Sequence, residues 1–298
     1  MAPRVSVVLP TRDRAATLGR SLASVLGQTF DDLELIVVDD GSTDGTVELL
    51  DAVDDERLLR VRLEGRNGPA VARNAGLRQA AGSLVAFQDS DDEWSPTKLA
   101  AQVARLDAAG DGLGGVGGAY RVEAPGPTTT VRSRALEAGR DYERDLLEGP
   151  CCITPVWLLR RAVVEQVGGF DEGLPCLEDW DLMLRISAVV PLAAVPEVVL
   201  HKHGSPDSLG ADLRRRATAL AAIQRRHAPR WRAHRHDDAK LHLELAYLDA
   251  VDGRRAAALA HLGRGARHRA IGPASLLRLA TALRHAHRHG PQCWPARG

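Results

Sequence analysis

The feature that most constrains the fold is an apolar segment that runs directly into two carboxylates. Residues 34–44 read ELIVVDDGSTD, in which four aliphatic residues are followed at once by Asp39 and Asp40 and then by a Gly-Ser-Thr turn. An unbroken aliphatic run of this length is typical of a buried strand in a parallel sheet. Because open α/β sheets bind their ligands at the carboxyl ends of such strands, we expect both carboxylates to face a ligand.

The same arrangement recurs within the first ninety residues. Residues 5–11 form a second predicted strand, which stops at Pro10, and residues 84–87 form a third, which stops at Asp89-Ser90-Asp91-Asp92. Between the strands the apolar period becomes helical, over residues 18–26 and 70–81. Alternating strands and helices predict an α/β fold with a mostly parallel, doubly wound sheet.

Five motifs carry a resemblance to a known family. In chain order they are PTRDRAATL, QTFDDLELIVVDDGSTDGT, NGPAVARNAG, FQDSDDEWSPTKL and GGFDEGLPCLEDWDLMLRIS, within residues 4–210. In this order and spacing they resemble the family 2 glycosyltransferases of GT-A fold. The resemblance implies a Rossmann-like catalytic domain over residues 1–210, which transfers a sugar from a nucleotide-sugar donor with inversion at C1.

The acidic cluster after the third strand is the candidate metal site. A nucleotide-sugar donor carries a diphosphate whose charge must be neutralised as it leaves, and Mn²⁺ or Mg²⁺ prefers carboxylate oxygens. On an extended chain Asp89 and Asp91 point the same way while Asp92 turns aside. The resemblance implies that Asp91 binds the metal and that Asp89, with Ser90 between them, reaches the ribose or the metal. The alternative is a solvated turn that caps the helix after Pro96.

Asp39 and Asp40 suit the nucleobase, because a fixed carboxylate can accept the N–H of uracil or of guanine. The resemblance places this contact on Asp40, and we favour a UDP-sugar. The following Ser42, Thr43 and Asp44 are typical turn and helix-capping residues, and both roles can coexist.

Two other segments are predicted to contact the donor. Pro10, Thr11 and Arg12 would lie beside the base and ribose, although many relatives have an aromatic residue in place of Arg12. Its guanidinium could stack on the base, or it could be exposed with no ligand role. Asn67 and Arg73 belong to a glycine turn and the helix that follows it, whose amino end suits an anion.

The general base is predicted near residue 179. Glu178 and Asp179 lie in the first turn of a predicted helix, and the resemblance implies that Asp179 deprotonates the acceptor. The alternative for both acids is compensation of the helix dipole. His203, preferred over His201, is a candidate contact to the metal or diphosphate.

Residues 211–298 differ in composition from the rest. They contain 18 Lys or Arg against 6 Asp or Glu, a net charge of +12, while residues 1–210 carry −12, and nine of the eleven histidines lie in the tail. Helical spacing predicts a basic helical domain that packs on the catalytic domain, forms a homodimer, or docks on an anionic membrane or acidic polymer. Scattered arginines without interleaved aromatic residues argue against nucleic-acid binding.

Several other patterns set limits on the function. The four cysteines have no metal-site or disulfide spacing, and no secretory signal or membrane-length apolar segment is evident, so we expect a cytoplasmic protein. The run GLGGVG at 112–117 lacks a strand-to-helix context for dinucleotide binding and is predicted to be a flexible loop.

The function alternatives are a sugar-nucleotide nucleotidyltransferase and a non-catalytic scaffold that keeps the fold. The first would normally need a glycine-rich, basic loop after the first strand, which PTRDRAATL is not, and the second would not need both Asp91 and Asp179. The acceptor stays open among a saccharide, a lipid-linked intermediate, a small metabolite and a peptide.

Overall fold

The computed structural model describes residues 2–123, 129–131, 142–147, 153–203, 212–233, 242–249 and 254–267. The chain forms two compact units. The first comprises Met1–Leu146, Cys151–Glu172 and Asp179–Ser205, and the second comprises Leu147–Pro150, Gly173–Glu178 and Pro206–Gly298. The sequence analysis placed one boundary near residue 210, whereas the second unit also includes two short segments from earlier in the chain.

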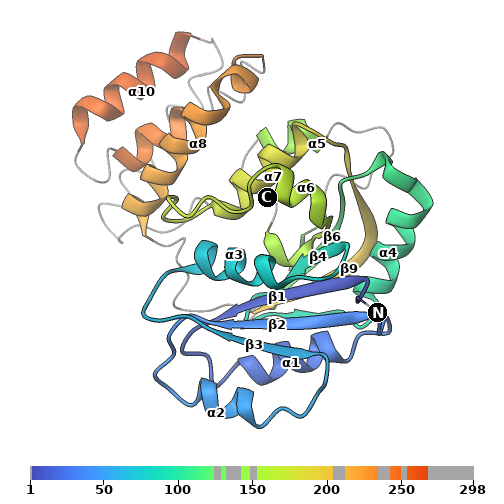
Figure 1. Cartoon of the computed structure of the whole chain (residues 1–298). Helices are drawn as coiled ribbons and strands as arrows, with labels where there is room; N and C mark the ends of the chain where they lie inside the picture. The colour runs from blue at the N-terminus through green and yellow to red at the C-terminus, as the bar shows by residue number, and fades with distance from the viewer. Residues whose placement is uncertain are drawn as a thin grey trace. The chain divides into compact units, whose positions relative to one another are not determined.

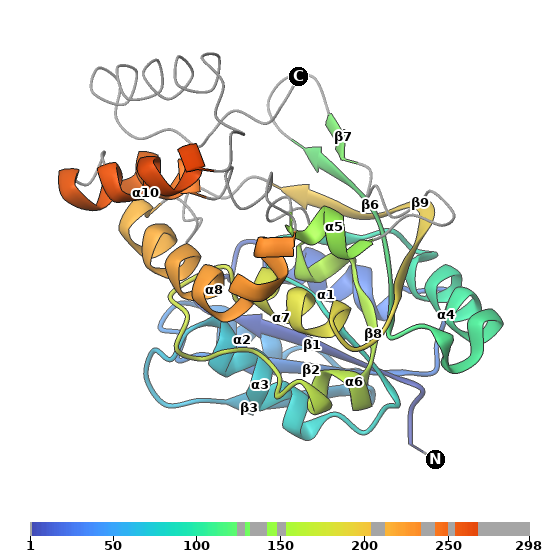
Figure 2. The ribbon, with the colours of Figure 1, turned by 90° about the horizontal axis from the view of Figure 1, so that it is seen from above.

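The first unit is built on one sheet with strand order β3-β2-β1-β4-β8-β6-β9-β5, and β7 pairs with β6 (Figure 1). The first four strands are parallel where they pair, as predicted. β8 is antiparallel to both of its neighbours, while β6 and β9 run side by side in parallel (Figure 2). The bounds are β1 Val5–Thr11, β2 Leu33–Asp39, β3 Leu58–Arg62, β4 Leu84–Phe87, β5 Glu93–Trp94, β6 Gly115–Glu123, β7 Thr129–Val131, β8 Leu158–Arg160 and β9 Leu192–His203.

Helices cover both faces of the parallel half of the sheet, with α3 on one face and α1 and α2 on the other (Figure 1). This double cover explains why β1 and β2 read as continuous aliphatic runs rather than alternating ones. Gly76 of α3 lies so close to β1 that a Cβ there would fall 2.3 Å from Val8 Cγ1. The helices of the first unit are α1 Leu18–Leu26, α2 Thr46–Asp51, α3 Pro69–Gln79, α4 Lys98–Ala109, α5 Tyr142–Leu147, α6 Arg161–Gln166 and α7 Glu178–Ser187, with the first residue of α7 and the last of α5 assigned to the second unit.

The prediction of a flexible loop at 112–117 is wrong in its second half. Gly115, Gly117 and Gly118 belong to β6 and are buried. A Cβ on Gly118 would fall 2.5 Å from Val199 Cγ1, and one on Gly117 would fall 3.0 Å from the Trp157 ring. The glycines therefore let the side chains of Val199 and Trp157 pack directly against the backbone of β6. Apolar periodicity in the sequence does not reveal such a strand.

The described residues of the second unit after residue 205 are almost all helical, as predicted for this part of the chain, whereas residues 173–177 of the same unit are not. The unit contains α8 (Leu213–Ala233), a helix over residues 242–249 and α10 (Arg255–Arg267). Residues 268–298 of the predicted helical domain lie outside the described residues. None of the helices in the described ranges is long and apolar enough to span a membrane.

Candidate functional site

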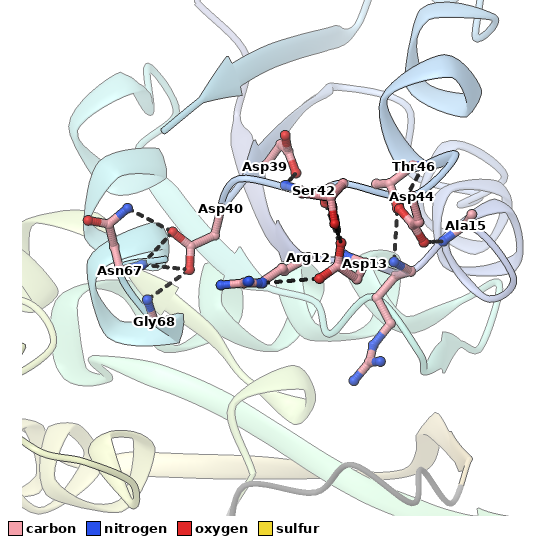
Figure 3. Close-up of polar contacts among 12 residues, drawn as sticks. Arg12, Asp13, Ala15, Asp39, Asp40, Ser42, Asp44, Thr46, Asn67 and Gly68 are labelled. Carbon is pink, nitrogen blue, oxygen red and sulfur yellow. Dashed lines mark hydrogen bonds and ion pairs between the residues drawn. The ribbon is translucent and has the colours of Figure 1, made fainter. Parts of the chain in front are cut away.

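The loops after β1 and β2 are joined by reciprocal hydrogen bonds (Figure 3). The Asp13 carboxylate accepts the Thr43 N–H (2.8 Å), and the Asp13 N–H donates to Ser42 Oγ (2.9 Å). Asp44 accepts the Ala15 N–H at 3.1 Å. The Thr43 N–H lowers the pKa of the Asp13 carboxyl, so the joining group stays ionised at neutral pH. The predicted turn residues thus fix the first loop against the second.

Asp40 and Asn67, both predicted to contact the donor, bind each other. The Asp40 carboxylate accepts hydrogen bonds from the Asn67 N–H (2.9 Å), Asn67 Nδ2 (2.9 Å) and the Gly68 N–H (2.8 Å) (Figure 3). Gly68 has φ of +96°, a conformation that favours glycine, and α3 begins directly after it. The Asn67 N–H also reaches Asp40 Oδ2 at 3.1 Å, so three donors share both oxygens. A carboxylate has about four lone-pair positions, which leaves at most one for a base N–H.

Asp39 has different partners. Its Oδ1 accepts the Ser42 N–H (3.0 Å), and its Oδ2 lies 3.6 Å from Arg62 Nε. Nearby, Arg12 Nε donates to Asp13 (3.2 Å). Thr11 Oγ1 and Arg12 Nη1 are buried and have no hydrogen-bond partner among the residues that the structure describes. The Thr11 hydroxyl and an Arg12 N–H group are thus available where the sequence predicts contacts to the base and ribose, next to the half-buried Pro10.

The segment Asp89-Ser90-Asp91-Asp92, which follows β4, is called the acidic turn below, and Arg73 lies against it. Its Nη2 donates to Asp89 Oδ1 at 2.8 Å, and its guanidinium stands 5.4 Å from the centroid of the Phe170 ring. Arg73 is buried and Asp89 is half-buried. The arginine predicted to bind the donor therefore also orients Asp89, a link that the sequence did not reveal.

The prediction for Asp92 assumed an extended chain, but residues 90 and 91 form a turn, and the partners of Asp92 lie on β9. Asp92 is fully buried, accepts the His203 N–H (2.9 Å) and lies 3.4 Å from Lys202 Nζ. Burial raises the pKa of Asp92 to about 7. This contact brings the backbone of His203 to the turn, and its ring Nε2 lies 3.6 Å from Glu93 Oε2. The His201 ring faces Glu123 at 3.2 Å.

Neighbouring charges act on the pKa of Asp91 in opposite directions. Burial, and then the charge of Asp89, raises the pKa of the Asp91 carboxyl, while Lys202 and Arg14 act in the opposite direction. Burial lowers the pKa of Lys202, but the three nearby carboxylates outweigh it and leave that pKa above its ordinary value. Lys202 is a site residue that sequence reasoning missed, since its only signal was a lysine between two histidines.

The acidic turn fits a cation that arrives with the donor. In the described part of the chain, no group of three or more His, Cys, Asp or Glu side chains is arranged to hold a metal ion. Mg²⁺ and similar cations at nucleotide sites commonly use one or two carboxylates plus phosphate oxygens and water. Asp91, with Asp89 beside it, supplies that smaller set, and a bound cation would relieve their repulsion.

Asp179 lies in the first turn of α7, within the same compact unit as the acidic turn. It is half-buried, and its Oδ1 accepts the Trp180 N–H at 2.7 Å. Glu178, the first residue of α7, is buried. Asp181 is fully buried and pairs with Arg185 Nε at 2.8 Å, so its carboxylate has a structural task.

The comparisons with known proteins agree with this geometry. The model of glycosyl transferase family 2 matches residues 6–168, more than half of the chain. The protein belongs to glycosyl transferase family 2. A relative in Escherichia coli, the UDP-Glc:α-D-GlcNAc-diphosphoundecaprenol β-1,3-glucosyltransferase WfaP, is 35% identical over 99 residues, which are 33% of this chain and 39% of WfaP. The matches span about two fifths or less of the length of the first curated relatives.

Two solved structures share the GT-A fold. The mannosyltransferase PcManGT of Pyrobaculum calidifontis, in complex with GDP-Man and Mn²⁺, has a TM-score of 0.63 and 25% identity, over 97% of this chain and 82% of that one. S. aureus TarS 1–349 with UDP-GlcNAc has a TM-score of 0.66 and 17% identity, over 97% of this chain and 88% of TarS. The predicted family and fold class are thereby confirmed.

Proposed function

We propose that this family 2 glycosyltransferase transfers a hexose from a UDP-sugar to an acceptor with inversion at C1, assisted by Mn²⁺ or Mg²⁺. The observation that carries the proposal is the acidic turn after β4. There Asp91 is half-buried beside Asp89 and its pKa is raised, at the strand end where α/β sheets bind ligands. The complex of PcManGT with GDP-Man and Mn²⁺ supports a cation and a nucleotide-sugar in this fold.

Each side chain then has a defined task toward the donor. Asp40 and Asp39 accept N–H groups of the base, while Thr11 Oγ1 and Arg12 Nη1, which have no described partner, donate to its oxygens or to the ribose. Asp91, with Asp89, holds the cation, which neutralises charge on the departing diphosphate. Lys202 adds positive charge beside the turn.

Asp179 acts as the general base. Its carboxylate is half-buried in the first turn of α7, where Oδ1 accepts the Trp180 N–H, and in its ionised form it can take up the acceptor's proton. Removal of that proton lets the acceptor oxygen form its bond to C1 as the bond to the diphosphate breaks on the opposite face, which inverts C1. The acceptor is open. A saccharide linked to polyprenyl diphosphate comes first in a screen, since the name of WfaP includes one.

The test of the proposal is Mn²⁺-dependent UDP binding by titration calorimetry, followed by hydrolysis of a panel of UDP- and GDP-sugars. Asp91→Asn should lose the Mn²⁺ dependence and most donor affinity at an unchanged melting temperature, because the side chain lies at a strand end and anchors no core. Asp111→Asn, which changes an exposed carboxylate near the end of α4, is the matched control. Equal Mn²⁺ dependence in Asp91→Asn and the wild type would contradict the metal assignment.

A further inference from the structure

Three side chains make hydrogen bonds to the backbone carbonyls of the acidic turn. Ser21 Oγ lies 2.8 Å from Asp89 O and 2.5 Å from Asp92 O. Gln88 Nε2 also donates to Asp92 O, at 2.8 Å. The third contact comes from Arg20 of α1, whose Nη2 donates to Asp91 O at 2.7 Å. Three of the four carbonyls of the turn thus face side chains of α1 or Gln88.

Ser21 and Gln88 are fully buried, so water cannot readily replace the bonds they make. Without Ser21, Asp89 O would keep the Asp92 N–H (3.3 Å) and Asp92 O would keep Gln88 Nε2 (2.8 Å), so what is lost is the buried hydroxyl that links the two ends of the turn. Ser21 has one hydroxyl proton shared between the two ends of the turn, and its short contacts keep those ends together. The peptide groups from Asp89 to Asp92 therefore have little freedom to rotate.

Fixed peptide groups also fix where the side chains leave the backbone. Asp89 is directed to Arg73, Asp92 to the backbone of β9, and Asp91 lies between them near Lys202. If the carbonyls were released, the turn could rotate and the two carboxylates would no longer be presented together. Ser21 and Gln88 are fully buried and out of reach of a bound donor, so their contribution would be to geometry alone.

We propose that Ser21, assisted by Gln88, is a positioning residue that holds Asp89 and Asp91 in the arrangement that takes up the divalent cation. The inference rests on the proposed function of the same turn. Ser21 acts through backbone carbonyls rather than through contact with metal or donor. Its removal should weaken cation uptake while leaving the fold in place.

The chain offers a matched control three residues along the same helix. Ser24 Oγ accepts the Trp94 N–H (3.1 Å) and donates to Ser21 O (2.8 Å), so it ties α1 to the segment beyond the acidic turn. Ser24→Ala and Ser21→Ala remove the same atom from the same helix. Only Ser21→Ala removes a contact to the carbonyls of Asp89 and Asp92.

The experiment measures Mn²⁺ uptake directly, from the loss of the free Mn²⁺ signal in electron paramagnetic resonance at saturating UDP. Ser21→Ala should weaken Mn²⁺ binding by roughly 5- to 50-fold, the range expected from losing one buried hydrogen bond. Gln88→Leu should weaken it in the same direction, and Ser24→Ala by less than about twofold. Melting temperatures without ligand should be similar for the two serine variants.

Wild-type Mn²⁺ affinity in Ser21→Ala, or an equal loss in Ser24→Ala, would overturn the positioning role. If Ser21→Ala does not fold, Gln88→Leu decides by the same criterion. A wild-type protein that takes up no Mn²⁺ with UDP would overturn the proposed metal dependence itself and this inference with it. Normal uptake by the wild type together with an unaffected Ser21→Ala would remove only the positioning role.

Discussion

At the scale of single residues, the same chemical group has a different task at each strand end. Asp40 pins the turn before α3, Asp39 caps its own turn, and Asp92 fastens the acidic turn to β9. Asp91 and Asp179 are only half-buried, one in the acidic turn beside Asp89 and the other in the first turn of α7. The environment, rather than the residue type, separates anchoring carboxylates from those available for chemistry.

Asp179→Asn tests the proposed base. The change keeps the shape and the contact to the Trp180 N–H but removes the proton acceptor, so turnover should fall by about 10²–10⁴-fold with donor affinity nearly unchanged. Turnover in a transfer assay, paired with UDP titration, measures both quantities. Near-normal turnover would move the role to Glu178, because Asp181 is committed to Arg185.

Asp40→Asn tests the double role of that carboxylate. An amide has one acceptor atom, so it cannot accept all the N–H groups from Asn67 and Gly68, and an N–H left unsatisfied costs about 1–3 kcal/mol. We expect a lower melting temperature together with weaker UDP binding. Asn67→Ala is the comparison variant, since it removes one hydrogen bond to Asp40 and leaves the carboxylate in place. Unchanged UDP affinity in Asp40→Asn would leave Asp40 as an anchor only.

At the scale of elements, α4 begins with a buried lysine. Lys98 is 1% exposed, and its Nζ donates to Gln102 Oε1 (2.6 Å) and lies 4.3 Å from the centroid of the Trp94 ring. Burial lowers the pKa of Lys98 well below its ordinary value. The unfolded chain then binds a proton that the folded chain lacks, at pH values between the folded pKa and the unfolded value of about 10.4. In that window stability rises with pH.

Lys98→Met tests whether burial of the Lys98 ammonium makes the stability of the fold depend on pH. Methionine matches the apolar stem and does not titrate, so the wild type should gain stability relative to the variant as the pH rises from about 7 to about 10. Urea unfolding at several pH values measures the difference. A constant difference would mean that the Trp94 ring and Gln102 keep the ammonium charged throughout.

The sequence predicted the elements whose signal is local. β2 and the carboxylates at its end, α1, and the first turn of α7 follow from apolar period and capping residues. The bonds between Asp40 and the Asn67 turn, and between Ser21 and the acidic turn, join residues far apart in the chain. The glycine-rich start of β6 was misread because its packing partners lie in other elements. Such contacts depend on topology, which no window along the sequence contains.

At the scale of the whole molecule, the second unit combines segments from three parts of the chain. Trp231 of α8 is fully buried and donates its Nε1–H to Leu147 O at 3.0 Å, within that unit. Leu174 and Cys176 of the same unit are buried as well. Leu147, the last residue of α5, therefore depends on α8 for a buried hydrogen bond.

Deletion of residues 206–298 tests this dependence. The truncated chain keeps Leu147, Leu174 and Cys176 but loses the rest of their unit, so newly exposed apolar surface should lower its melting temperature and its solubility. Trp231→Phe is the milder companion variant, which keeps an aromatic ring and removes the hydrogen bond to Leu147, with an expected cost of about 1–3 kcal/mol. Thermal melts and sedimentation at low and high salt separate loss of packing from loss of charge, since only the charge effect is screened. The charge lost is +11, because Asp207 is deleted together with the +12 of residues 211–298. A truncated protein that is equally heat-stable, soluble and unchanged in oligomeric mass would show instead that the basic helices are a separate docking module, and membrane or acceptor binding would then be the property to measure.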